Sequence, residues 1–167
     1  DAVYKVLDKL FTKESYKIKN SLEYIDIAID ALNHIPSVQV LRMSPIYESE
    51  PWGYANQEKF YNAVIEVETN LTAYTLLGVC LGIEAGVGRV RSIKNGPRVL
   101  DLDLLLFEGQ ESMTAELTLP HPRMFERDFV LIPLRDLYPE MKIYKKYNLV
   151  HYYEILDESS FMKKVEF

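Results

Sequence analysis

Two aspartates in an apolar run are the residues best suited to chemistry. Asp101 and Asp103 stand two apart in the segment 99–107, and residues two apart in a strand share one face. Neighbouring carboxylates repel each other, and a divalent cation such as Mg²⁺ removes that penalty. The alternative is a solvated strand with two exposed acids. The opposite face of the predicted strand holds Leu100, Leu102, Leu104 and Leu106. Leu105 and Phe107 follow the aspartates on the aspartate face.

A basic segment directly precedes these aspartates. Between residues 85 and 100 the chain has four cations and no acid, although its net charge is −6. These cations are Arg89, Arg91, Lys94 and Arg98. Acids beside cations suit a metal-bound polyphosphate, because the metal neutralises some phosphate oxygens and arginines bind others. The alternative is a solvated loop that pairs with acids such as Glu84. The chain lacks the glycine-rich phosphate loops, so side chains and metal must hold any nucleotide.

A second basic group and several aromatic residues extend this pattern. His121 lies between two prolines in a stiff, extended segment, which suits a fixed hydrogen-bond donor, and Arg127 follows it. An aromatic slot with one amide side chain would accept a flat heterocycle, because stacking supplies affinity and the amide reads the ring edge. The candidates for that slot are Trp52, Phe60, Asn62 and Phe129. The alternative for each of these residues is a structural place in the core.

The elements that must position these residues follow from apolar spacing. Helical spacing predicts a helix over 22–32 with Ser21 as its N-cap and a second over 76–83 with Thr72 as its N-cap. Alternation predicts a strand over 60–69, and the leucine-rich segment 99–107 predicts a central strand. The remaining predicted elements are a strand from Val38 toward Tyr47, a short strand at 117–119, a helix over 125–137 with a break or kink at Pro133, and a strand and short helix within 142–167. This order favours an α+β fold with helices packed on a mostly antiparallel sheet.

Composition limits the class of protein. A chain of 167 residues with 48% hydrophobic and 26% charged residues suits a single domain over 1–167. The single cysteine, Cys80, excludes an intrachain disulfide and a cysteine-rich zinc site. A pI near 5.1 argues against a nucleic-acid partner. The absence of a long apolar stretch or a signal-like start argues against a membrane partner and predicts a cytoplasmic protein. The oligomeric state stays open.

Several motifs together carry a family resemblance. Residues 95–104, Asn-Gly-Pro-Arg-Val-Leu-Asp-Leu-Asp-Leu, resemble the signature of the 6-hydroxymethyl-7,8-dihydropterin pyrophosphokinases, which act in folate synthesis. Further motifs of that family occur in the expected order at 44–53, 60–64, 83–91, 119–124 and 126–131. The resemblance therefore covers roughly residues 21–139.

The resemblance implies a ferredoxin-like fold and a reaction. That reaction is transfer of pyrophosphate from ATP to the hydroxymethyl group of the pterin, with release of AMP. Asp101 and Asp103 would hold two Mg²⁺ ions and act in catalysis with Arg89 and Arg91. The residues implied around ATP are Glu84, Arg98, His121 and Arg127. Those implied at the pterin are Ser49, Trp52, Phe60, Asn62 and Phe129.

The first twenty residues depart from the family pattern. The usual Gly-Ser-Asn-x-Gly segment after the first strand is missing, and residues 1–20 contain no glycine. Either residues 2–7 form the first strand with an altered loop, or the sequence begins atypically. This departure motivates an alternative function, a degenerate relative that binds ATP or pterin without efficient turnover. A second alternative is an RNA-binding module on the same fold, which the acidic composition disfavours.

Overall fold

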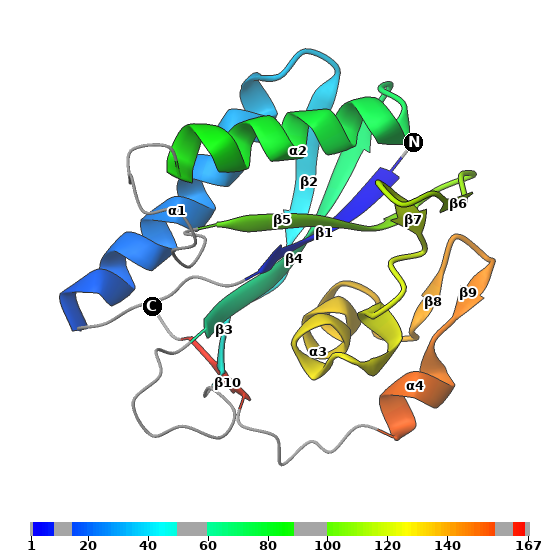
Figure 1. The fold of residues 1–167 in the computed structure, drawn as a ribbon. Helices are drawn as coiled ribbons and strands as arrows, with labels where there is room; N and C mark the ends of the chain where they lie inside the picture. Colours follow the sequence, from blue (N-terminus) through cyan, green and yellow to red (C-terminus); the bar gives the residue numbers. More distant parts are fainter. Residues whose placement is uncertain (1, 9–14, 50–59, 89–99, 156–161, 166–167) are drawn as a thin grey trace.

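The computed structural model describes residues 2–8, 15–49, 60–88, 100–155 and 162–165 (Figure 1). Its main sheet combines strands from both ends of the chain. The strands are β1 (Ala2–Asp8), β2 (Val38–Met43), β3 (Tyr47–Ser49), β4 (Phe60–Thr69), β5 (Asp101–Phe107) and β10 (Met162–Lys164). The order is β10-β3-β4-β1-β5, β2 also pairs with β4, and every pairing is antiparallel. The first strand is therefore present at the start of the chain.

Two helices cover one face of this sheet. They are α1 (Ser15–His34) and α2 (Ala73–Gly88); in Figure 1, α2 lies above the strands and α1 runs obliquely along their left-hand side. Each helix connects strands of the sheet in the order β-α-β-β-α-β, counting β2 and β3 as one position. The mixed α+β class and the ferredoxin-like arrangement expected from the sequence are confirmed. None of the helices in the described ranges is long and apolar enough to cross a membrane.

The helix boundaries agree only partly with prediction. Thr72 caps α2 as expected, because its Oγ1 accepts the Thr75 N–H at 3.2 Å. The N-cap predicted at Ser21 is wrong, since α1 begins at Ser15. Apolar spacing locates the buried stripe of a helix, here Ile25, Ala28 and Leu32. It does not report where the hydrogen-bonded backbone begins.

Strand β5 is present as predicted but differs in position and in face. Among the described strands it pairs with β1 alone, so it lies at the edge of the sheet rather than at its centre. Its pairing shifts between Leu104 and Leu106, where a β-bulge adds a residue. An added residue exchanges the two faces beyond it. Leu106 therefore joins the buried cluster on the face of the sheet opposite α1 and α2, and Phe107 joins the cluster beneath those two helices.

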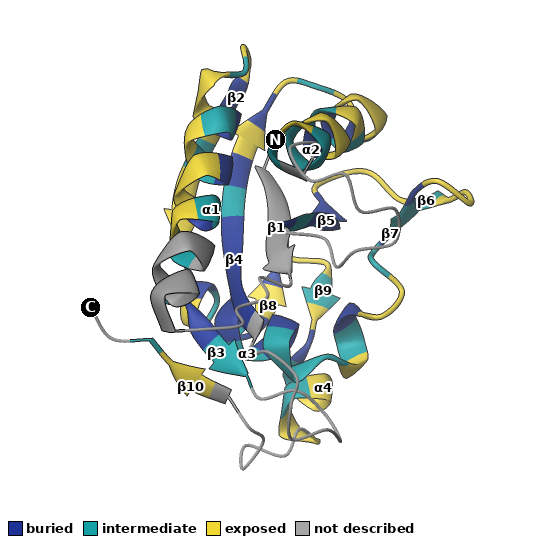
Figure 2. Cartoon of the chain, turned by 60° about the vertical axis from the view of Figure 1, so that its left-hand side comes forward, coloured by how far each residue is buried: buried dark blue, intermediate teal, exposed yellow. Residues whose placement is uncertain are grey.

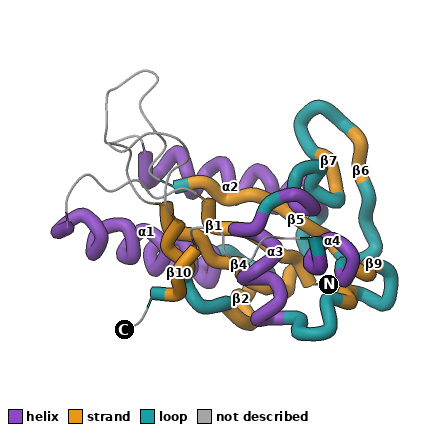
Figure 3. The backbone as a smooth tube through the Cα atoms, turned by 90° about the horizontal axis from the view of Figure 1, so that it is seen from below, coloured by secondary structure: helices purple, strands orange, loops and turns teal. Residues whose placement is uncertain are grey.

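The other face of the sheet is covered by later elements. They are the turn η1 (Met124–Glu126), α3 (Asp128–Leu137), α4 (Val150–Glu154) and the hairpin β8–β9 (Lys142–Ile143 with Tyr147–Asn148). The hairpin β6–β7 (Ser112–Met113 with Thr118–Leu119) instead adds Leu117 and Leu119 to the cluster beneath α1 and α2. Seen from below, α3 and α4 lie in front of the sheet (Figure 3). Helix α3 continues through Pro133 to Leu137, so no break occurs there. The short strand near 117–119 and the strand and helix of the tail are confirmed.

Candidate active site

The aspartate pair lies on the face of the sheet that α3 covers. Asp101 and Asp103 are half-buried, whereas Leu102 between them is buried beneath α2 with 2% of its surface exposed. The register places Val6 of β1 opposite both Asp103 and Val64. Asp103 and Val64 are thus level in the sheet, two strand spacings or about 10 Å apart. The same side of the sheet therefore carries the aspartates and the α3-facing residues of β4.

These two carboxylates suit a magnesium ion that arrives with its substrate. In the described ranges no three His, Cys, Asp or Glu side chains form a group that could enclose a metal. Mg²⁺ prefers oxygen ligands and commonly takes only one or two carboxylates, with phosphate oxygens and water completing its octahedron. The two carboxylates on one strand are half-exposed, so such a metal ion and its other ligands can reach them from solvent. The donor set therefore fits a nucleotide-bound Mg²⁺.

His121 is fixed beside the aspartate strand by its own backbone. Its N–H donates to the carbonyl of Leu105 at 2.8 Å, which attaches it to β5. Its ring Nδ1 accepts the N–H of Arg123 at 3.2 Å, so the neutral ring carries its proton on Nε2. Burial lowers the pKa of His121; the Asp103 carboxylate opposes this, and the guanidinium groups of Arg127 and Arg123 add to it. The ring is therefore held as a neutral Nε2–H donor near Asp103.

Arg127 and Phe129 meet at the start of α3. The Arg127 guanidinium carbon lies 5.3 Å from the centroid of the Phe129 ring, within cation–π range. The Arg127 carbonyl accepts the N–H groups of Val130 and Leu131 at 3.1 and 3.0 Å, which anchors this residue at the helix entrance. The family resemblance assigns Arg127 to ATP and Phe129 to the pterin, and the structure places the two side chains in contact.

Asn62 lies on β4, close to the first turn of α3. Its side chain is 1% exposed, and it shares a face with Val64, two residues on. Val64 packs in one cluster with Val130 and Leu131, the residues that follow Phe129. Asn62 and Phe129 therefore belong to neighbouring elements. Ser49 is half-buried at the end of β3, opposite Phe60, the first residue of β4.

Glu84, near the end of α2, contacts the backbone of the aspartate strand. Its Oε1 accepts the N–H of Leu102 at 2.6 Å, and its side chain is half-buried. The sequence singled out this residue for a place around ATP; the contact with β5 could not be read from its type or spacing.

The structure does not describe the side chains of the remaining predicted site residues. Trp52, Arg89, Arg91 and Arg98 lie outside the described residues. Of the thirteen predicted site residues, the ones with described side chains are Ser49, Asn62, Glu84, Asp101, Asp103, His121, Arg127 and Phe129.

A polar network on the same face escaped sequence analysis. Glu66 accepts hydrogen bonds from the guanidinium of Arg42 at 2.6 Å and from the hydroxyl of Tyr138. Arg42 also donates to the Leu137 carbonyl at 3.1 Å and lies 5.0 Å from the Tyr138 ring centroid. No motif signals this network, because its hydrogen-bonded partners are 24 to 95 residues apart along the chain. It ties the end of α3 to β2 and β4.

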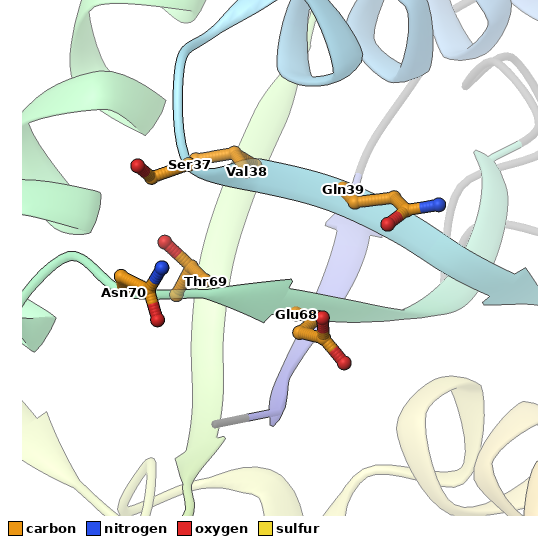
Figure 4. A pocket seen from close by; sticks show the side chains of 6 residues that line it. All are labelled: Ser37, Val38, Gln39, Glu68, Thr69 and Asn70. Atoms are coloured by element: carbon orange, nitrogen blue, oxygen red, sulfur yellow. The ribbon is translucent and has the colours of Figure 1, made fainter.

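A hollow lies at the opposite end of β4. It has a volume of about 270 Å³ and is lined by Ser37, Val38, Gln39, Glu68, Thr69 and Asn70. Figure 4 shows the hydroxyl of Thr69 and the amide of Asn70 at one end of it, and the carboxylate of Glu68 at the other. The register sets Glu68 opposite Ala2, whereas Asp101 faces Asp8 at the other end of β1. The hollow is therefore remote from the aspartate pair.

Comparison with known proteins agrees with this arrangement. The family model described as 7,8-dihydro-6-hydroxymethylpterin-pyrophosphokinase (HPPK) matches residues 17–139. A Methylorubrum extorquens protein named 2-amino-4-hydroxy-6-hydroxymethyldihydropteridine pyrophosphokinase is 43% identical over 116 residues, 70% of this chain and 73% of that protein. Its Pseudomonas aeruginosa namesake is 38% identical over 138 residues, 83% of this chain and 85% of that protein.

Longer relatives contain the same region as one part. The folic acid synthesis protein fol1 of Schizosaccharomyces pombe is 40% identical over 124 residues, which are 74% of this chain but 17% of that protein. The family match covers nearly all of α1 and the whole of α2, the aspartate strand β5 and α3. The chain belongs to the 7,8-dihydro-6-hydroxymethylpterin-pyrophosphokinase family.

Proposed function

We propose that this chain transfers pyrophosphate from ATP to the hydroxymethyl group of 6-hydroxymethyl-7,8-dihydropterin, releasing AMP, as a step of folate synthesis. The relatives that match this chain over most of their own length are named as pyrophosphokinases of that pterin. The observation that carries the proposal is the shared sheet face, where a half-buried carboxylate pair, a neutral histidine donor and a buried amide lie near one another.

The phosphate side of the site is formed by β5 and the segment after it. Asp101 and Asp103 would hold the expected two Mg²⁺ ions, which neutralise phosphate charge and position the transferred group. The Nε2–H of the neutral His121 ring donates a hydrogen bond to a phosphate oxygen. Arg127 supplies a positive charge from the start of α3. Arg89, Arg91 and Arg98 remain predictions from the family resemblance.

The pterin side is formed by β3, β4 and the first turn of α3. The Asn62 side chain, held in a buried position, reads the ring edge, and the Phe129 ring stacks on the ring face. Ser49 borders the same end of the sheet. Trp52 and Phe60 would complete the slot. The substrate hydroxyl is itself the nucleophile, so the enzyme contributes positioning and charge neutralisation rather than a covalent intermediate. Because ATP is the donor, we propose the cytoplasm as the compartment.

Release of AMP tests this proposal most directly. Purified protein with ATP, Mg²⁺ and 6-hydroxymethyl-7,8-dihydropterin should form AMP, and Asp101→Asn should lower that rate at least a hundredfold, since it removes one of two metal carboxylates. Asp26→Asn on the exposed side of α1 is the matched control and should keep the wild-type rate. Calorimetric titration with a non-hydrolysable ATP analogue should show binding that requires Mg²⁺. Binding without AMP release would instead identify a degenerate relative.

A further inference from the structure

We propose that Glu84 is a positioning residue for the metal-binding strand: its carboxylate fixes the backbone between Asp101 and Asp103. This inference rests on the proposed function, because it assigns Glu84 a task within that reaction. It adds a contact to the protein itself to the nucleotide contact that the family resemblance implies for Glu84.

The position of β5 at the sheet edge creates the need for such a residue. A strand inside a sheet finds acceptors for its N–H groups on both neighbours, but β5 has β1 on one side only among the described strands. Leu102 is 2% exposed, so water cannot satisfy its amide at low cost. The Glu84 Oε1 accepts that amide at 2.6 Å. A charged acceptor makes a shorter and stronger bond than a neutral one.

A second contact holds the same strand three residues further on. The His121 N–H donates to the Leu105 carbonyl at 2.8 Å. Asp103 lies between the two attachment points, at Leu102 and Leu105, and Asp101 is the immediate neighbour of the first. The other side of β5 is fixed by its pairing with β1. The backbone carrying both carboxylates is thus held from two directions.

Fixing the backbone of β5 matters because two metal ligands on one strand move together. A small rotation of the strand displaces both carboxylates relative to the phosphate oxygens that share their ions. Residues that orient metal ligands typically change metal affinity or activity by about 10- to 100-fold when removed. The attachment also comes from α2, whose buried residues Leu76 and Cys80 belong to the same core cluster as Leu102. Glu84 therefore links the rigid helical core to the metal-binding strand.

Two substitutions at this position separate positioning from charge. Glu84→Ala removes the acceptor, whereas Glu84→Gln keeps an oxygen acceptor and removes the charge. The first readout is amide hydrogen exchange of Leu102 in the ligand-free protein, followed by NMR. The second is the Mg²⁺ concentration that gives half-maximal AMP formation. Glu116→Ala, an exposed glutamate in the turn between β6 and β7, is the control.

We expect Glu84→Ala to speed Leu102 exchange at least tenfold and to raise the Mg²⁺ requirement about tenfold or more. Glu84→Gln should shift both quantities by less than Glu84→Ala, and the control should shift neither. Unchanged Leu102 exchange in Glu84→Ala overturns the proposal. So does a Glu84→Gln protein that needs as much Mg²⁺ as Glu84→Ala while Leu102 stays protected, because the carboxylate would then act on the ligand by charge. If the wild-type protein forms no AMP, the proposed function fails, and the exchange measurement alone decides the Glu84 contact.

Discussion

The two faces of the sheet are built for different purposes. Beneath α1 and α2, strands β4 and β5 present an unbroken apolar surface that includes Ala63, Ile65, Val67, Leu102 and Leu104. On the opposite face, the same strands present Asn62, Glu66, Asp101 and Asp103, and α3 packs on the apolar residues between them, such as Val64 and Leu105. In Figure 2, β4 is largely dark blue, whereas α1 shows exposed residues along its outer side.

Within a single strand, the residues of one face stabilise the core and those of the other face are available for chemistry. Alternation sends each successive side chain to the other face, so one strand anchors the core and carries ligands at once. Asp103 and Leu102 are adjacent residues with opposite surroundings, which makes them a matched test of the difference.

The largest effect is expected for that adjacent pair. Asp103→Ala should lower AMP formation about a thousandfold, equivalent to about 4 kcal/mol, because a metal carboxylate is lost. It should change the free energy of unfolding by less than about 1 kcal/mol, since the side chain is half-exposed. Leu102→Ala should instead lower the free energy of unfolding by about 3 kcal/mol through lost burial and a residual cavity. Urea denaturation and initial rates of AMP release measure both quantities.

The reverse pattern would contradict this separation of roles. If Asp103→Ala destabilises the protein as much as Leu102→Ala does, the aspartate face is also part of the structural core. Residual activity of Leu102→Ala should be measured well below its own unfolding midpoint, so that lost folding is not read as lost catalysis.

A moderate effect is expected for the polar network at the end of α3. Tyr138→Phe removes the hydroxyl that donates to Glu66 and leaves that half-buried carboxylate with one partner fewer. We expect the free energy of unfolding to fall by about 1 to 2 kcal/mol, with AMP formation unchanged. Tyr152→Phe, an exposed tyrosine on α4, is the control and should be neutral. Loss of activity in Tyr138→Phe would show that this network also supports the site.

The smallest effect concerns the pH dependence of stability. The folded-state pKa of His121 lies below the ordinary 6.5, so between these two values the unfolded chain binds more protons than the folded one. This contribution is fully present above pH 6.5 and is lost as the pH falls through the folded-state pKa. His121→Asn removes the titration and should flatten the fall in stability between pH 7.5 and 5. Denaturation curves at several pH values compare the two proteins, and identical slopes would show that His121 is not held neutral.

Much of the fold could be predicted because local patterns repeat. The helical spacing of Leu76 and Cys80 and the cap at Thr72 defined α2, and the alternation from residue 60 to 69 defined β4. Val64 shows the limit of this reasoning. Alternation places it with Glu66 on the less apolar face, yet it is buried, because α3 packs there. A strand does not reveal which of its faces a distant helix will cover.

The site, like the fold, could be predicted from the sequence only in part. Residue types and spacing pointed to the aspartate pair, His121 and Asn62, because paired carboxylates suit a metal ion, a histidine between prolines suits a fixed donor, and an amide suits the edge of a flat ring. They could not show that Nδ1 of His121 is occupied by the Arg123 amide or that Arg127 lies against Phe129. Those facts depend on side-chain geometry at the entrance of a helix.

The amino-acid sequence alone indicated the class of the fold and the two carboxylates that face one way, since these depend on composition, on periodicity and on neighbours within a few residues. Its motifs indicated the family by resemblance. Only the tertiary structure decided that β5 pairs with β1 alone among the described strands, that a bulge exchanges its faces after Leu104, and that Glu84 supplies an acceptor for Leu102. The physical reason is distance along the chain. Strand neighbours, bulges and side-chain contacts are settled by packing between segments far apart in sequence, where many local patterns are compatible with more than one partner.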